Sequence, residues 1–112
     1  MKFTIDRSRW LRGRDADVGE GSRLYRTSDK KMCCMGFYLR RCGMSVTDIQ
    51  EKSLPRLVET DLPPSAGWIV GHAENDLAIV NDIRRHKHRE RAIKTIFKRH
   101  GVDVTFKGGK TK

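Results

Sequence analysis

The sequence predicts a small single α+β domain, in which about four helices pack on a two- or three-stranded antiparallel sheet. Two segments near the chain ends, 2–6 (KFTID) and 102–106 (VDVTF), alternate apolar and polar residues as half-buried strands do, and we expect them to pair. Between them, apolar residues recur at helical spacing. A chain of 112 residues can bury one modest core, so we expect one domain over 1–107 and a flexible basic tail over 108–112.

A short helix is expected directly after the N-terminal strand. Asp6 or Ser8 can cap it, and it would run through Trp10 and Leu11. Residues 13–22 then contain three glycines among small and polar residues, which is typical of an exposed loop.

The most apolar stretch, 32–42 (MCCMGFYLRRC), predicts the central helix, and Gly43 is a natural end for it. Gly36 inside this stretch costs about 1 kcal/mol relative to Ala. We therefore expect either a close approach of another backbone at Gly36 or a helix that begins later. Ser45, with Asp48 three residues on, resembles a capping box and predicts the start of a further short helix.

The middle of the chain is predicted to be rich in loops, because Pro55, Pro63 and Pro64 interrupt it. The apolar residues 68–70 (WIV) are expected to enter the core from this region. Residues 76–83 (DLAIVNDI) predict one helix, and its continuation into the next helical segment is left open by the sequence.

The most informative segment is RRHKHRERAIKTIFKRH, over 84–100. It holds eight Lys or Arg residues against one acid. Within it Ala92, Ile93, Ile96 and Phe97 recur at helical spacing, so one stripe can pack on a core while the cations face water. A cationic helix that faces solvent suits a polyanion, and nucleic acid is the commonest one.

Charge along the chain is uneven. The formal net charge is +10, whereas residues 44–82 hold only two cations against seven acids, so we expect one basic and one acidic face. A helix-turn-helix pattern and an aromatic-studded strand are both missing, so we expect contact with a nucleic-acid backbone rather than with bases. The alternative is a solvated charged face without a partner. The predicted binding residues are the cations of the C-terminal helix and the N-terminal arginines that strand pairing would place beside it: Arg84, Arg85, Lys87, Arg89, Arg91, Lys94, Lys98, Arg99, Arg7, Arg9 and Arg12.

The cysteines favour core packing over chemistry. Zinc motifs usually separate paired thiols by two to four residues, and the adjacent Cys33 and Cys34, followed at a distance by Cys42, match this spacing poorly. A thiol- or zinc-dependent enzyme, with Cys34 as nucleophile, is the weaker alternative. No phosphate-binding glycine loop and no paired carboxylates are present. We therefore predict a non-enzymatic protein with no catalytic residues, no metal ligands and no cofactor.

Asn81 and Asp82 follow an apolar helical segment. Side chains of these types readily form hydrogen bonds to nearby backbone groups, so we expect a structural role for them.

Neither a membrane span nor a signal peptide is expected. No apolar run approaches about 20 residues, and the N-terminal residues lack an apolar stretch of the signal-peptide type. An odd number of cysteines does not make a disulfide framework. These features predict a cytoplasmic protein.

Five pieces of sequence carry a resemblance: RWLRG (9–13), KMCCMGF (31–37), VND (80–82), Arg89-Glu90 and HGVDVTF (100–106). Together they resemble a family of small bacteriophage and prophage proteins with a CC-(L/M)-GF core motif, a proline-containing loop, an Asn-Asp turn and a closing strand. The likeness spans most of the chain, although its middle matches loosely. The family has no settled activity, so no site residues are carried over. The resemblance implies an accessory phage product that acts in a bacterial cytoplasm.

These observations lead to two main hypotheses. The first is a non-enzymatic phage accessory protein that binds nucleic acid or a host nucleoprotein complex through the cationic helix over 84–100. The second is a protein-binding inhibitor of a bacterial defence system such as CRISPR–Cas, which acts on a defence nuclease or its guide complex. A homodimer is a further option, with the apolar stretch 32–42 at its interface.

Overall fold

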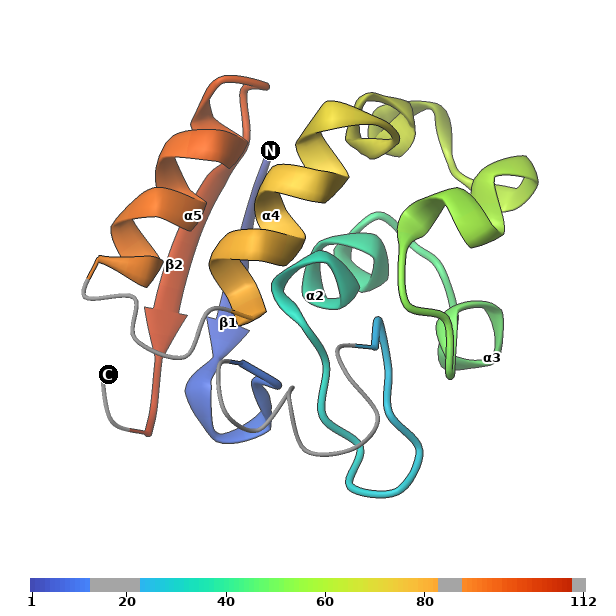
Figure 1. The fold of residues 1–112 in the computed structure, drawn as a ribbon, viewed down its shortest axis with the longest axis horizontal. Coiled ribbons are helices and arrows are strands. Elements are labelled where there is room, and N and C mark those ends of the chain that lie inside the picture. Colours follow the sequence, from blue (N-terminus) through green and yellow to red (C-terminus); the bar gives the residue numbers. More distant parts are fainter. Residues whose placement is uncertain (13–22, 83–87, 110–112) are drawn as a thin grey trace.

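The computed structural model describes residues 1–12, 23–82 and 88–109 (Figure 1). The whole predicted loop 13–22, and residues 110–112 of the predicted tail, lie outside these ranges. Within them the chain forms two strands, four α-helices and three 3-10 helices around one hydrophobic core. The helices outnumber the four that were predicted, because proline-containing segments taken for loops form short 3-10 helices.

The two terminal strands pair as predicted, but the predicted antiparallel orientation is wrong. Strands β1 (Lys2–Asp6) and β2 (Asp103–Lys107) are parallel, with Phe3 aligned to Val104, and no third strand joins them among the described residues. Alternation of apolar and polar residues is the same in both chain directions, so it cannot determine orientation. Parallel pairing needs a long crossover, and here nearly the whole chain supplies it.

The helix before β2 fixes the direction of that strand. Helix α5 (Arg89–Lys98) was expected from its apolar stripe, and Gly101, with φ of 75°, makes the turn that sends β2 back along it (Figure 1). The end of β2 therefore lies near the start of α5. Arg7, which follows β1, bonds Glu90 in the first turn of α5, so β1 ends at the same side of the molecule.

The sheet has one buried and one exposed face. Phe3, Ile5 and Val104 are at most 5% exposed and enter the core, where α2 packs on β1 and α5 packs on β2. The opposite face carries side chains that are polar and exposed: Lys2, Thr4, Asp103, Thr105 and Lys107. The exposed strand residues thus lie on the face of the sheet opposite the core.

The first helix is shorter than predicted. The 3-10 helix η1 (Arg7–Arg9) is capped as expected by Asp6, whose Oδ1 accepts hydrogen bonds from the Ser8 amide at 3.0 Å and hydroxyl at 2.7 Å. It ends before Trp10, because Trp10 leaves the helix to form an isolated parallel bridge with Met32.

The central helix is confirmed, with shorter bounds than the predicted 32–42. Helix α2 (Cys34–Arg41) ends two residues before Gly43, whose φ of 103° turns the chain away from the helix. The expected close approach at Gly36 is also confirmed, because a Cβ atom there would lie 1.9 Å from the backbone oxygen of Leu24. This position therefore admits only glycine without a shift of the backbone.

The prolines of the middle segment begin helices. Helix α3 (Val46–Ile49) starts with the predicted capping box of Ser45 and Asp48. The 3-10 helices η2 (Pro55–Asp61) and η3 (Pro64–Ile69) each have proline at the first position, where a missing N–H costs nothing. The prediction of a loop-rich middle was wrong for this reason.

Helix α4 (His72–Asp82) begins four residues before the predicted start at Asp76. Its buried Glu74 holds η2, since the carboxylate accepts from the Arg56 amide at 3.0 Å and forms an ion pair with Arg56 Nε at 3.3 Å. Helices α4 and α5 lie side by side (Figure 1), so they are two separate helices and not one continuous helix.

Candidate functional site

The outer face of α5 is the main candidate site. On its inner side Ile93, Ile96 and Phe97 are at most 8% exposed, which confirms the predicted apolar stripe. At 1.5 Å per residue, the exposed cations span about 12 Å along the helix axis. We call this set the α5 cationic face, and it comprises four exposed side chains: Arg91, Lys94, Lys98 and Arg99.

The α5 cationic face keeps most of its charge. Lys98 Nζ lies 2.7 Å from the Asp103 carboxylate, but both side chains are more than half exposed, and such surface pairs contribute little. Lys94 Nζ lies 5.8 Å from the centre of the Phe106 ring. Among the described residues, none of the four cations forms an ion pair with the acidic segment 44–82. The charges therefore remain available to an anionic partner.

Arg89 has a different environment from these four. It is 4% exposed, and its Nε donates to the backbone oxygen of Val80 at 3.1 Å. Burial lowers the pKa of Arg89, while the charges of Asp82 and Glu90 act in the opposite direction. Arg89 was predicted from the sequence to face solvent and to bind a partner. Instead it joins the end of α4 to the start of α5, and its guanidinium cannot reach a ligand.

Arg7 is also bonded to other parts of the molecule, and its side chain is 18% exposed. Its Nε and Nη2 donate to the two oxygens of Glu90 at 2.9 and 2.8 Å, and its Nη1 donates to the Gly108 oxygen at 3.2 Å. The hydrogen bonds to Glu90 raise the pKa of Arg7. This fork neutralises the single acid of the cationic segment and fastens η1 to α5. The expected extension of the binding patch through Arg7 is therefore not present.

The other predicted cations divide into three groups. Arg9 is exposed on η1, so it remains a candidate for contact with a partner. Arg12 is half-buried, with its guanidinium carbon 4.3 Å from the centre of the Trp10 ring. The last three lie outside the described residues: Arg84, Arg85 and Lys87.

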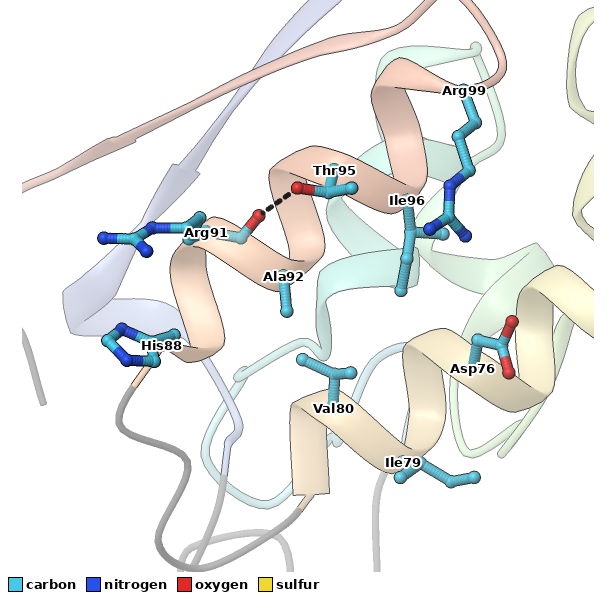
Figure 2. A pocket seen from close by; sticks show the side chains of 9 residues that line it. All are labelled: Asp76, Ile79, Val80, His88, Arg91, Ala92, Thr95, Ile96 and Arg99. Carbon is cyan, nitrogen blue, oxygen red and sulfur yellow. Dashed lines mark hydrogen bonds between the residues drawn. The ribbon is translucent and has the colours of Figure 1, made fainter.

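A groove of about 460 Å³ separates α4 from α5. In Figure 2, Val80 and Ala92 point toward one another in this groove. The Arg99 side chain is directed from the end of α5 toward Asp76 on α4. Arg91 points away from α4, and Ile79 is 57% exposed. Sequence patterns did not reveal this groove, because it depends on how two separate helices pack. Its lining combines apolar and charged residues: Asp76, Ile79, Val80, His88, Arg91, Ala92, Thr95, Ile96 and Arg99.

Aromatic side chains are not offered to a ligand. The eight aromatic residues are all buried or half-buried. Tyr38 donates to the Ser65 oxygen at 2.8 Å and accepts from Trp68 Nε1 at 2.9 Å, and burial raises the pKa of Tyr38 to about 12. No exposed Phe, Tyr or Trp is therefore available to stack on nucleic-acid bases.

A second notable region is buried. The amide oxygen of Asn81 accepts from Trp10 Nε1 at 2.8 Å and from the Cys34 backbone N–H at 3.0 Å. Its Nδ2 donates to the Leu11 oxygen at 2.8 Å and to Asp82 Oδ1 at 2.9 Å. The side chain is fully buried, and two acceptor and two donor bonds use its hydrogen-bonding capacity. The predicted structural role is confirmed, and we call this network the Asn81 cluster.

Five separate pieces of sequence (9–13, 31–37, 80–82, 89–90 and 100–106) meet at or beside the Asn81 cluster. Trp10 comes from RWLRG, Cys34 from KMCCMGF and Asn81 from VND. The Phe106 ring, from HGVDVTF, lies 5.1 Å from the Trp10 ring, and Arg89 bonds Val80 beside Asn81. The association of these pieces could be found only from the fold, because the contacts join residues up to 96 positions apart along the chain.

The thiols pack in the core, as favoured from the sequence. Cys33 and Cys34 are fully buried, and Cys42 is half-buried. Burial raises the pKa of the Cys34 thiol well above its usual range, and the neighbouring Cys33 and Asp82 act in the same direction. A thiolate nucleophile is therefore disfavoured at this position. The described residues contain no group of three or more His, Cys, Asp or Glu side chains arranged to hold a metal.

Comparison with known proteins gives no relative. No protein-family model, curated protein or solved structure matches this chain. In the part of the chain that the structure describes, no helix has both the length and the apolar character needed to cross a membrane.

Proposed function

We propose that this protein is a non-enzymatic accessory protein of phage origin, which binds the phosphate backbone of nucleic acid, free or within a host nucleoprotein complex, in the bacterial cytoplasm. One observation carries the proposal: Arg91, Lys94 and Arg99 are exposed on one helix, without an ion-pair partner among the described residues. Cations in this state gain free energy by displacing the counterions of a polyanion.

The contact expected from this surface is weakly specific. Four cations within about 12 Å can meet a few successive phosphates. No Phe, Tyr or Trp ring is exposed to stack on bases. We therefore expect the logarithm of the affinity for duplex DNA to fall with the logarithm of salt concentration with a slope of about −3 to −4.

The test compares two charge-reversed variants by fluorescence anisotropy with duplex DNA, single-stranded DNA and structured RNA. The double variant Arg91→Glu/Lys94→Glu removes half of the α5 cationic face. The matched control, Lys30→Glu/Lys52→Glu, makes the same change of net charge at exposed lysines outside α5. We expect the first to lose affinity more than about tenfold and the control to change it by about twofold, because charges beyond about 8 Å are screened at physiological salt.

Two results would oppose the proposal. Failure of all three probes to bind at low salt would exclude nucleic acid as the partner. Equal losses in both variants would show that net charge matters, and not the α5 cationic face. Circular dichroism should show the same fold for both variants, because all four positions are exposed.

A protein partner is the second candidate, and the α4–α5 groove favours it. Apolar Val80, Ala92 and Ile96 line the groove, and Ile79 beside them is 57% exposed, which a phosphate backbone does not require. This candidate corresponds to an inhibitor that binds a defence nuclease. A nuclease-treated host lysate separates the two candidates, because only a protein partner survives the treatment. Ile79→Asp should then reduce capture, while Leu57→Asp, at a side chain of equal exposure, should not.

A further inference from the structure

The outer edge of β2 has no strand partner in the part of the chain that the structure describes. The Asp103 backbone N–H donates to the Met1 oxygen at 2.9 Å, so the backbone groups of Asp103 face β1. Successive residues of a strand direct their backbone groups to opposite edges, so Val104 and Phe106 direct theirs away from β1. Neither has a backbone hydrogen bond outside the β1–β2 ladder among the described residues. An edge of this kind is a template for another strand.

A cationic pocket lies beside this edge. It has a volume of about 510 Å³ and lies between α5 and β2. Its apolar part comes from Val102 and Val104, and its one carboxylate, Asp103, is already bonded to Lys98. Three cations and one acid give the pocket a positive balance. The full lining is Lys94, Thr95, Lys98, Arg99, Val102, Asp103 and Val104.

We infer that β2 accepts an extended acidic segment of a protein partner as a third strand of the sheet. The backbone of that segment would form hydrogen bonds with the N–H and C=O groups of Val104 and Phe106. These bonds supply affinity that does not depend on the sequence of the partner segment. Its alternate side chains would enter the pocket, where carboxylates meet Lys94, Lys98 and Arg99 and their methylene groups pack on the valines. Charge complementarity thus selects acidic residues at alternate positions.

Other occupants fit the edge less well. A second copy of the chain, paired through β2, would bring one set of Lys94, Lys98 and Arg99 toward an identical set, and like charges repel. A nucleic-acid backbone can accept from the free N–H groups of Val104 and Phe106 but offers no regularly spaced donors to their carbonyls. Only a peptide satisfies both kinds of group. The inference shares Lys94, Lys98 and Arg99 with the proposed nucleic-acid surface. It differs in requiring the strand edge, which nucleic-acid binding does not need.

The direct test is amide hydrogen exchange, followed by NMR. The probe is an acetylated and amidated peptide of about seven residues, Thr-Glu-Thr-Glu-Thr-Glu-Thr, which can span the five residues of β2. In the free protein, the Val104 and Phe106 amides should exchange faster than that of Thr105, which faces β1. Saturating peptide should slow exchange at Val104 and Phe106 about tenfold or more and leave Thr105 unchanged. Unchanged exchange at both residues would overturn the inference.

A pair of variants separates backbone pairing from side-chain contact. Val104→Pro removes an N–H that β1 does not use, so the β1–β2 ladder keeps its bonds, whereas Val104→Ala retains that N–H. We expect the first to weaken peptide binding about tenfold or more and the second about threefold at most. Equal affinities would contradict strand addition. If Val104→Pro does not fold, methylation of the peptide nitrogens that face β2 applies the same test, and undiminished binding of the methylated peptide would overturn the inference.

Charge selectivity and the nature of the occupant need their own controls. The neutral peptide Thr-Gln-Thr-Gln-Thr-Gln-Thr should bind about tenfold more weakly, and equal binding would refute the acidic preference. Protected Val104 and Phe106 amides in the peptide-free protein, together with a dimer mass, would identify a second copy as the occupant and overturn the proposal. Val104→Pro should bind nucleic acid as the wild type does. Failure of the strand-addition inference can therefore be distinguished from failure of the nucleic-acid proposal.

Discussion

Arg89 and Arg91 lie two positions apart in α5 and have opposite environments. Arg89 is 4% exposed and bonds the backbone of Val80, whereas Arg91 is exposed and forms no ion pair with any described residue. The same contrast separates two regions of the molecule. In the Asn81 cluster every polar group of the side chain has a partner inside the protein, and in the α5 cationic face most charges do not. Residue type alone therefore does not show which cation stabilises the fold and which one is available to a partner.

The largest expected effect is in the Asn81 cluster. Asn81→Ala leaves Trp10 Nε1, the Cys34 N–H and the Leu11 oxygen without their partner. We expect the free energy of unfolding, measured in urea, to fall by about 3 to 5 kcal/mol. Asn75→Ala, at an exposed position of the same helix, is the control and should change it by about 0.5 kcal/mol at most. A loss below about 1 kcal/mol for Asn81→Ala would show that the cluster does not hold the fold.

The next largest effect concerns the backbone contact under α2. A methyl group at Gly36 would lie 1.9 Å from the Leu24 oxygen, so Gly36→Ala forces the two segments apart. We expect a loss of about 2 to 3 kcal/mol in thermal or urea unfolding. Gly67→Ala is the matched control, because a Cβ there meets nothing within 4 Å. If both variants have the same stability, the contact at Gly36 is not rigid.

Arg89 and Arg91 give the sharpest version of the comparison. Arg89→Ala removes a buried side chain and its bond to Val80, and should cost about 2 kcal/mol of unfolding free energy. Arg91→Ala should change stability by about 0.5 kcal/mol at most and weaken nucleic-acid binding. The opposite ranking of the two variants in unfolding experiments would reverse the assignment of roles.

The smallest effect is a pH dependence at the edge of the cationic face. The hydrogen bond from Lys98 lowers the pKa of Asp103 below its ordinary value of 3.8. The pKa of this carboxylate is lower in the folded state than in the unfolded state. Its charge therefore stabilises the fold at pH values above the unfolded pKa, and this contribution is lost as pH falls through the folded pKa. Asp103→Asn should therefore lose slightly less stability than the wild type between about pH 5 and about pH 2. If the urea midpoints of the wild type and of Asp103→Asn change equally across that pH range, the surface pair contributes nothing to stability.

Several parts of the fold could be predicted because their causes are local. The caps at Asp6 and Ser45, the glycine that ends α2 and the apolar stripe of α5 each depend on a few neighbouring residues. The α5 cationic face was predictable for the same reason, since charges opposite an apolar stripe face water. The proline-initiated helices of the middle segment were missed, because proline is equally compatible with a turn and with the first position of a helix.

The sequence by itself determined the two terminal strands and the helices outside the proline-containing middle segment, which side of α5 is buried and that the chain carries a strong positive charge. Only the tertiary structure decided the parallel orientation of β1 and β2, the burial of Arg89, the neutralisation of Arg7 by Glu90 and the association of Trp10 with Asn81. The physical reason is distance along the chain. Local patterns depend on neighbouring residues, whereas these contacts join residues far apart in sequence or depend on how separate elements pack.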